Sequence, residues 1–364
     1  MKILFMCLFS TLVCVSQQNM DTIYGNPKSV REKVIFLNKS KLNYKFLTDS
    51  DYGHGVGFFP KAIKERFNSY WYNYHWVFYV NYYKEFLKNG EVKTEIWYNR
   101  DSTLKSKYEY THNKNRNLTE EKKIYFDSTF SLRKNTYDYK GKLKSYIFYY
   151  SDKTDMYQYV LFKHDAANNL VKTTRFNDEG YTSTIYNTYS SQNKLLNTTI
   201  HSPKKWVDLG SGSSSYVNDS VGTWTTRNKY EYDLSGNLVL KLRFADKNSI
   251  SRKTIYKYDS NNNLIYEGYA RDTVYAYKKY DYNKNNDKVY YEYAIIGDST
   301  SRHLVKFTYN KKGYITKAFC FLKSKAYNID FNYKFDDNNN WIEIVKTVNG
   351  EPLFVWTRKI VYHN

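Results

Sequence analysis

The sequence predicts an all-β protein of stacked antiparallel β-hairpins, about 26 residues each, that together form one long coiled or curled sheet. One reason is a turn motif that recurs at regular spacing, and a second is the alternation of apolar and polar residues on both sides of that motif. The third is composition: the 364 residues include 42 Tyr and 21 Phe but only 4 Pro. Aromatic residues favour strands, and so many of them exclude a disordered chain.

Residues 1–16 are expected to be a signal peptide. One Lys precedes an apolar run from Ile3 to Val15, and this run is shorter than the roughly 20 residues that a membrane-spanning helix needs. The pattern is typical of a secretory signal that is cleaved after Ser16. A lipoprotein acylated at Cys14 is the alternative. We therefore expect a secreted, periplasmic or cell-surface protein with no transmembrane segment after signal removal.

Residues 17–92 lack clear turn motifs and are expected to form a partly irregular N-terminal cap region. In this region "FFPKAIKERF" could begin a short helix, with Pro60 near its first turn. The following "YWYNYHWVFYVNYY" alternates aromatic and other residues, which predicts a strand that caps the first exposed edge of the sheet. A ligand platform is the alternative. The aromatic positions on one face of this strand would be Tyr70, Tyr72, Tyr74, Trp76 and Phe78.

Residues 93–364 are expected to form the hairpin repeat domain. In "YEYDLSGNLVLKLRF", Asp233 suits the first position of a type I turn, because its side chain can accept hydrogen bonds from the backbone just ahead. Gly236, three residues on, suits a positive φ. From Asp233 onward the turns recur at spacings of 26, 24, 27 and 26 residues. The same pairing of Asp or Asn with Gly or Asn recurs at Asp259 and Asn262, Asn310 and Gly313, and Asp336 and Asn339.

The residues after each turn alternate in character. In "LVLKLRF", Leu240 and Leu242 share one face of the strand, and Lys241 and Arg243 share the other, which indicates a half-buried antiparallel strand. A single hairpin cannot bury its own apolar face, so each one needs neighbours. Open twisted sheets rarely exceed about ten strands without curling. The sequence therefore predicts a superhelix, an open barrel-like spiral or a two-layer wrap.

Four of these units, "YEYDLSGNL", "YKYDSNNNL", "FTYNKKGYI" and "YKFDDNNNW", resemble the YD repeat of Rhs-type and teneurin-like proteins. The opening "IYGNPKSVREKVIFLN" and the C-terminal stretch look like secreted RHS/YD-repeat-like proteins of the Bacteroidota type. The resemblance covers about residues 96–364 and implies a β-sheet superhelix outside the cytoplasm. In large Rhs proteins such repeats enclose a C-terminal toxin, but here the match runs to Asn364 and the repeat is longer. The resemblance implies no catalytic residues.

A Gly/Ser-rich insertion at residues 201–226 interrupts the repeats. Loops carry function more often than scaffolds do, so Trp206, Tyr216 and Trp224 are the candidate binding residues. A tolerated flexible insertion is the alternative.

The remaining chemistry-bearing residues predict no active site. The net charge of +20 is spread along the chain without a block of like charges, so we read it as background; nucleic acid is not an expected partner of a secreted chain. The His residues lack metal-ligand spacing, and no HExxH, CxxC or GxSxG motif occurs. The turns at Asp259 and Asp336 lack the Gly and Glu of a calcium loop. Cys320, the one cysteine outside the signal, is expected to be a buried strand residue. We expect no metal, no cofactor and no catalytic residue.

Three functions agree with these features. The first is a secreted or envelope-associated, non-enzymatic β-repeat scaffold that mediates protein or cell-surface interaction. The second is a carbohydrate-binding module for acidic or surface glycans. The third is a degenerate Rhs-type component of a toxin delivery system. The expected partner is accordingly an unknown protein or a surface glycan.

Overall fold

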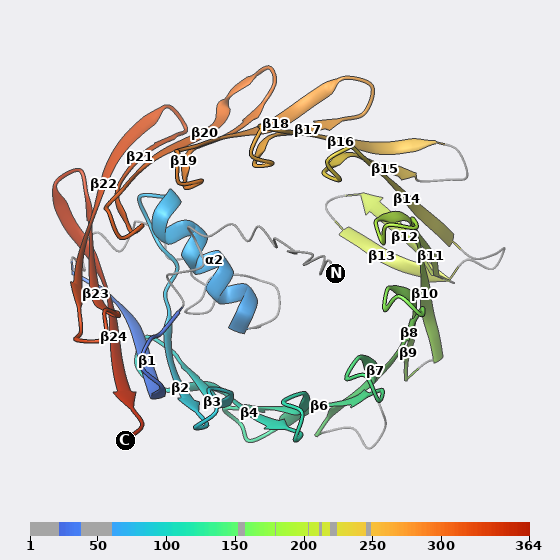
Figure 1. Ribbon diagram of the computed structural model, residues 1–364, viewed down its shortest axis with the longest axis horizontal. Helices are drawn as coiled ribbons and strands as arrows, with labels where there is room; N and C mark the ends of the chain where they lie inside the picture. The colour runs from blue at the N-terminus through green and yellow to red at the C-terminus, as the bar shows by residue number, and fades with distance from the viewer. Residues whose placement is uncertain are drawn as a thin grey trace, which may run out of the picture.

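A ring of antiparallel strands forms the body of the protein (Figure 1). The computed structural model describes residues 22–37, 60–151, 157–178, 180–202, 204–210, 213–218, 224–244 and 249–364. The predicted signal peptide, including Cys14, lies outside these residues. In the described part of the chain, 22 strands belong to one sheet, and two more form a separate small sheet.

The strands of the large sheet fall into two sequential groups. The first group comprises β1 (Pro27–Phe36), β2 (Asn81–Phe86), β3 (Val92–Tyr98), β4 (Leu104–His112), β5 (Leu118–Tyr125), β6 (Phe130–Tyr137), β7 (Leu143–Tyr150), β8 (Gln158–His164), β9 (Leu170–Asn177), β10 (Gly180–Tyr189) and β11 (Leu195–Ser202). The second comprises β14 (Trp224–Tyr232), β15 (Leu238–Phe244), β16 (Ile250–Tyr258), β17 (Leu264–Ala270), β18 (Val274–Tyr282), β19 (Lys288–Ile295), β20 (Asp298–Tyr309), β21 (Ile315–Leu322), β22 (Lys325–Phe335), β23 (Trp341–Val348) and β24 (Glu351–Tyr362).

The sheet is a closed barrel, so the expected coiled or curled open sheet is wrong. Strand β1 pairs antiparallel with β24, with Val30 opposite Ile360 and Glu32 opposite Arg358. Its other edge pairs with β2. Closure pairs both edges of a sheet that would otherwise present unpaired backbone groups. The turn periodicity predicts which consecutive strands pair, but it contains no information about pairing between the first and the last strand.

The turns between the repeats have a common geometry. At Asp233, the backbone N–H of Gly236 donates to the Asp233 carbonyl at 2.9 Å, and Gly236 has a φ of 81°. The Asp233 carboxylate accepts the backbone N–H of Asn237 at 2.8 Å. These hydrogen bonds, first of all that from the Asn237 backbone, lower the pKa of Asp233. The corresponding φ values are 62° at Asn262 and 81° at Gly313.

Where a tyrosine precedes the turn, it links neighbouring repeats. The Tyr258 hydroxyl donates to the Leu238 carbonyl at 3.0 Å, and the Tyr282 hydroxyl donates to the Leu264 carbonyl at 3.0 Å. The turns are also linked to each other, because the Asn237 side-chain amide donates to the Asn262 side-chain oxygen at 2.8 Å. A tyrosine suits this position because its ring is partly buried while its hydroxyl reaches a backbone acceptor.

Helix α2 (Pro60–Asn73) lies inside the ring (Figure 1). Its buried residues Ile63, Phe67 and Trp71 recur every four residues and form the apolar stripe of an amphipathic helix. The Phe67 and Trp356 rings meet edge to face at 4.7 Å, which places this stripe against the inner face of β24.

The aromatic segment after Pro60 differs from its predicted structure. Tyr70 and Tyr72 belong to α2, and not to a capping strand. The Tyr70 and Tyr74 rings stack at 4.3 Å, one helical turn apart. Aromatic residues at every second position also include pairs four residues apart. This stretch therefore fits both the two-residue alternation of a strand and the spacing of one helical turn. Because β1 closes the ring, no capping strand is needed at this edge.

The two faces of the wall differ in chemistry. The register of the paired strands shows which side chains share the inner face of the ring. On β15, Lys241 and Arg243 lie on this inner face, toward the lumen, while Leu240 and Leu242 lie half-buried on the outer wall. The outer wall also carries ion pairs, which suit contact with water. Among them are Lys93–Glu85, Lys107–Glu109, Lys134–Glu120, Lys229–Glu231 and Lys334–Glu343.

Candidate functional site: a cavity in the lumen

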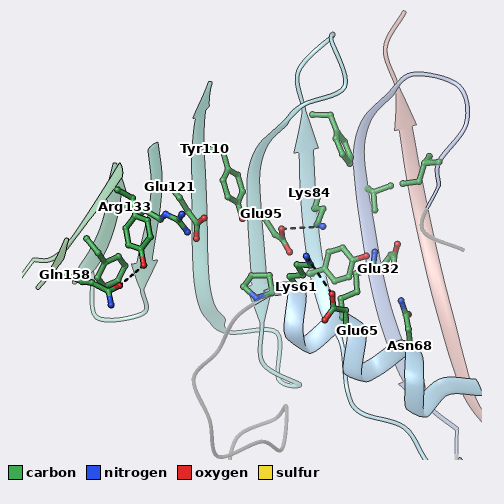
Figure 2. Close-up of a pocket in the computed structure, with 18 of the residues that line it drawn as sticks. Glu32, Lys61, Glu65, Asn68, Lys84, Glu95, Tyr110, Glu121, Arg133 and Gln158 are labelled. Atoms are coloured by element: carbon green, nitrogen blue, oxygen red, sulfur yellow. Dashed lines mark hydrogen bonds and ion pairs between the residues drawn. The ribbon is translucent and has the colours of Figure 1, made fainter. Parts of the chain in front are cut away.

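A cavity of about 890 Å³ lies between α2 and the inner faces of β1 to β8 (Figure 2). The helix contributes its N-terminal half, and each strand contributes the side chains that point inward. The polar lining residues are Glu32, Lys61, Lys64, Glu65, Asn68, Lys84, Glu95, Glu121, Arg133 and Gln158. The cavity is therefore rich in charged and hydrogen-bonding groups, with aromatic rings between them.

The carboxylate of Glu95 is held in place by its neighbours. Its side chain accepts a hydrogen bond from the Trp97 indole N–H at 2.6 Å, and Lys84 Nζ lies 3.4 Å from its other oxygen. Glu95 is only 5% exposed. A carboxylate that is buried, paired and hydrogen-bonded is a fixed acceptor at the cavity wall.

Glu121 lies farther along the wall, beyond Tyr110, and faces Arg133 (Figure 2). Burial raises the pKa of Glu121, and the negative charge of Glu95 raises it further, while Arg133 acts in the opposite direction. Lys123 is on the same face, and burial lowers its pKa to about 8. Of these groups, Glu121 and Arg133 line the cavity and give its middle side chains that can exchange hydrogen bonds with a polar ligand.

The substitution Glu121→Gln is expected to stabilise the protein at neutral pH. Because the folded-state pKa of Glu121 lies above the ordinary glutamate value of 4.5, the native protein binds the proton more tightly than the unfolded chain does. Wild-type stability therefore falls as the pH rises from 4.5 through the folded-state pKa, and the variant lacks this loss. Urea unfolding at several pH values should show a stability gap that grows over this window and then stays constant. A gap that is independent of pH would contradict the assignment.

The far end of the cavity is aromatic. Phe148, Tyr150 and Tyr157 form an edge-to-face cluster with ring centroids 4.9 to 6.1 Å apart. Beside them, the Tyr146 hydroxyl donates to the Gln158 side-chain oxygen at 2.9 Å, and the Arg133 guanidinium lies 4.1 Å from the Tyr146 ring centroid. Flat rings next to amide and guanidinium groups are the components of a site that binds a molecule with both apolar and hydroxyl-bearing faces.

The sequence-predicted binding residues lie elsewhere. Trp206 on β12 (Lys204–Gly210) is the register partner of Tyr216 on β13 (Ser213–Asn218) in the small separate sheet. Trp224 begins β14 and pairs with Ser202 of β11. The polar and aromatic residues that line the cavity come instead from α2 and the arc of the ring from β1 to β8. The signal that could have indicated the aromatic part is an aromatic residue at every second position, as at Tyr146, Phe148 and Tyr150 in "YIFYY".

Cys320 and His303 form a buried contact near α2. Cys320 lies fully buried in β21, as expected, and its Sγ is 3.9 Å from His303 Nε2. Burial raises the pKa of Cys320 to about 12 and lowers the pKa of His303. Both groups are therefore neutral near pH 7, which is unsuited to a thiolate–imidazolium nucleophile. Among the residues that the structure describes, no cluster of His, Cys, Asp or Glu is placed to hold a metal ion.

Comparisons with known proteins identify no family. No family model matches the chain, and no curated protein matches it. Among solved structures, the chain is similar to the crystal structure of TcdB2–TccC3, with a TM-score of 0.34 and 9% identity over 89% of this chain. The match spans only 19% of that protein. A porin-like protein from Bacteroides uniformis gives a TM-score of 0.28 and 10% identity, covering 70% of this chain and 95% of that one.

These similarities are too weak to say what this protein does, and the resemblance to YD repeats stays a prediction. Within the described ranges, none of the helices is long and apolar enough to cross a membrane.

Proposed function

We propose that this protein is a secreted or envelope-associated, non-enzymatic binding protein that holds a segment of a glycan in the lumen of its barrel. The observation that carries the proposal is the lumen cavity, whose aromatic end and hydrogen-bonding middle lie side by side. Sugars present apolar C–H faces and hydroxyl edges. Aromatic rings pack against the first, and carboxylate, amide and guanidinium groups bind the second.

The arrangement of the cavity favours a bound ligand over an enclosed cargo. The Rhs-type alternative requires a hollow interior, whereas α2 occupies part of this lumen (Figure 1). The helix supplies Lys61, Lys64 and Glu65 to the cavity wall, so it forms one side of the site. Interaction with another protein or with the cell surface stays a prediction of the sequence.

The substitution Tyr150→Ala is expected to weaken glycan binding about tenfold, because one aromatic contact contributes roughly 1 kcal/mol or slightly more. The matched control is Tyr149→Ala, which removes the same side chain from the same strand but from its outer face. Binding of residues 17–364 to a panel of envelope polysaccharides would be measured by calorimetry at low and high salt. The proposal requires salt-resistant binding that only Tyr150→Ala weakens. Equal effects of the two substitutions, or no binding to any polysaccharide in the panel, would contradict it.

A further inference from the structure

A second lumen site is formed by the inner faces of β11 and β14 to β17. These strands enclose a pocket of about 460 Å³, on a different arc of the ring from β1 to β8 (Figure 1). Three cationic side chains line it, Lys241 and Arg243 from β15 and Arg252 from β16. We propose that this pocket binds a tetrahedral oxyanion, of the sulfate or phosphate class.

The strand register concentrates positive charge in this pocket. Arg243 and Arg252 are direct cross-strand partners, and Lys241 is two residues from Arg243 on the same face. Directly opposed side chains in an antiparallel sheet have Cβ atoms about 5 Å apart, and like charges at that spacing are destabilising. The free protein therefore carries a local repulsion that a bound anion would relieve.

One carboxylate, Glu267, lines the pocket; its charge acts on Arg252, but it is also bound by other partners. Glu267 accepts hydrogen bonds from Lys278 Nζ at 3.0 Å and from the Tyr269 hydroxyl at 2.7 Å. The Arg252 guanidinium donates to a neutral group, with Nη2 3.4 Å from the Tyr275 hydroxyl oxygen. Three lining cations thus face one carboxylate that is shared with Lys278, which leaves a net positive charge for a ligand.

The other residues of the pocket suit the same ligand. Asn228 and Thr226 of β14 and the buried Thr254 of β16 line it and can donate hydrogen bonds. Two guanidinium groups offer forks of N–H donors that match oxyanion geometry, and hydrogen bonds to charged oxygens are the strong ones. An oxyanion between Arg243 and Arg252 would therefore meet charge and donors together.

The test compares two double variants of the full mature chain. Arg243→Gln with Arg252→Gln removes two lumen charges, and Lys253→Gln with Lys257→Gln removes two charges from the opposite face of β16. Calorimetry at fixed ionic strength would use inorganic sulfate, inorganic phosphate, a sulfated oligosaccharide and its desulfated counterpart. We expect the lumen variant to weaken oxyanion binding at least tenfold and the outer-face variant to change it less than twofold.

Comparing the four ligands distinguishes a free oxyanion from one that is carried by a glycan. Tight binding of the inorganic ions indicates a free anion, and tight binding of the sulfated oligosaccharide alone indicates a glycan-borne group; both support the site. Equal losses in the two double variants, or equal binding of the sulfated and desulfated oligosaccharides without binding of the inorganic ions, would overturn it.

Stability and the other lumen site provide independent checks. Without ligand, the lumen variant should melt at the same temperature as the wild type or higher, because the substitutions remove like-charge repulsion; a lower melting temperature would count against the repulsion. This proposal does not rest on the glycan cavity, because the two sites have different lining residues. Tyr150 lines the glycan cavity, and Arg243 and Arg252 line the oxyanion pocket. Either proposal can therefore fail without the other.

Discussion

Replacing Arg358 by Met is expected to destabilise the barrel by about 3–5 kcal/mol, because it leaves the buried carboxylate of Glu32 without its ion partner. Glu32 Oε1 accepts from Arg358 Nε at 2.9 Å and lies 2.9 Å from Nη2, and the Trp356 indole N–H donates to the other oxygen at 3.1 Å. The Arg358 guanidinium lies 3.6 Å from the Trp341 ring centroid. These contacts join β24 to β1, the pair of strands that closes the barrel and is called the seam below. We expect the variant to weaken the pairing at the seam before that of other strands.

The matched control for this substitution is Lys229→Met on the outer wall. Lys229 and Glu231 form an exposed ion pair, and such pairs contribute about 0–1 kcal/mol. Urea unfolding would give both free energies, and hydrogen exchange would show whether β1 and β24 open before the other strands. A loss below about 1 kcal/mol for Arg358→Met would contradict the role assigned to the seam.

The seam also gives the barrel an acid sensitivity. Burial alone would raise the pKa of Glu32, but the charges of Arg358 and nearby lysines lower it below the ordinary glutamate value of 4.5. A carboxyl group whose folded-state pKa is depressed contributes stability above its unfolded-state pKa and loses that contribution as the pH falls through the folded-state value. Opening of the seam is therefore expected below pH 4.5.

Replacing Lys346 by Met is expected to cost about 3 kcal/mol, because it leaves buried helix carbonyls without a donor. Lys346 is fully buried on β23, and its Nζ donates to the carbonyl oxygens of Trp71 at 2.6 Å and Tyr74 at 2.7 Å. These carbonyls lie at the C-terminal end of α2, where helix carbonyls lack partners within the helix. Burial lowers the pKa of Lys346 well below its ordinary value.

The expected effect of Lys346→Met is local as well as global. Hydrogen exchange of the α2 amides should accelerate more than that of the strands, because the substitution detaches the helix from the wall. Lys334→Met is the control, since Lys334 lies on the outer face of β22 and is 71% exposed. If α2 exchanges at the wild-type rate in Lys346→Met, this lysine does not hold the helix.

The turns could be predicted from the sequence because their chemistry is local. An Asp or Asn followed three residues later by Gly or Asn determines a tight turn without reference to the rest of the chain, as at Asp336 and Asn339. Closure depends on pairing between residues more than 300 positions apart, such as Glu32 with Arg358. Neither partner belongs to the repeat motif, so the periodicity predicted neighbouring hairpins but not the ring.

The candidate site was less accessible to sequence reasoning than the fold. The cavity combines inward residues of β1 to β8 with a helix that the sequence indicated only at its beginning, near Pro60. Residues such as Glu121 and Tyr150 have no motif of their own, and only the curvature of the closed wall brings them to one cavity. The Gly/Ser-rich insertion differs in composition from the repeats, yet of its described residues Thr226 alone lines one of these two lumen cavities.

The most direct test of the closed barrel is a disulfide across its seam. Ser29 of β1 and Val361 of β24 are register partners, and direct cross-strand partners have Cα atoms about 4.5–5.5 Å apart, within the range that a disulfide spans. The closed barrel predicts that Ser29→Cys with Val361→Cys oxidises to an intramolecular disulfide in the folded monomer, detected by mass spectrometry of the linked peptides. A double variant that stays reduced or cross-links only between molecules would contradict the closed barrel, and with it the lumen in which both sites are placed.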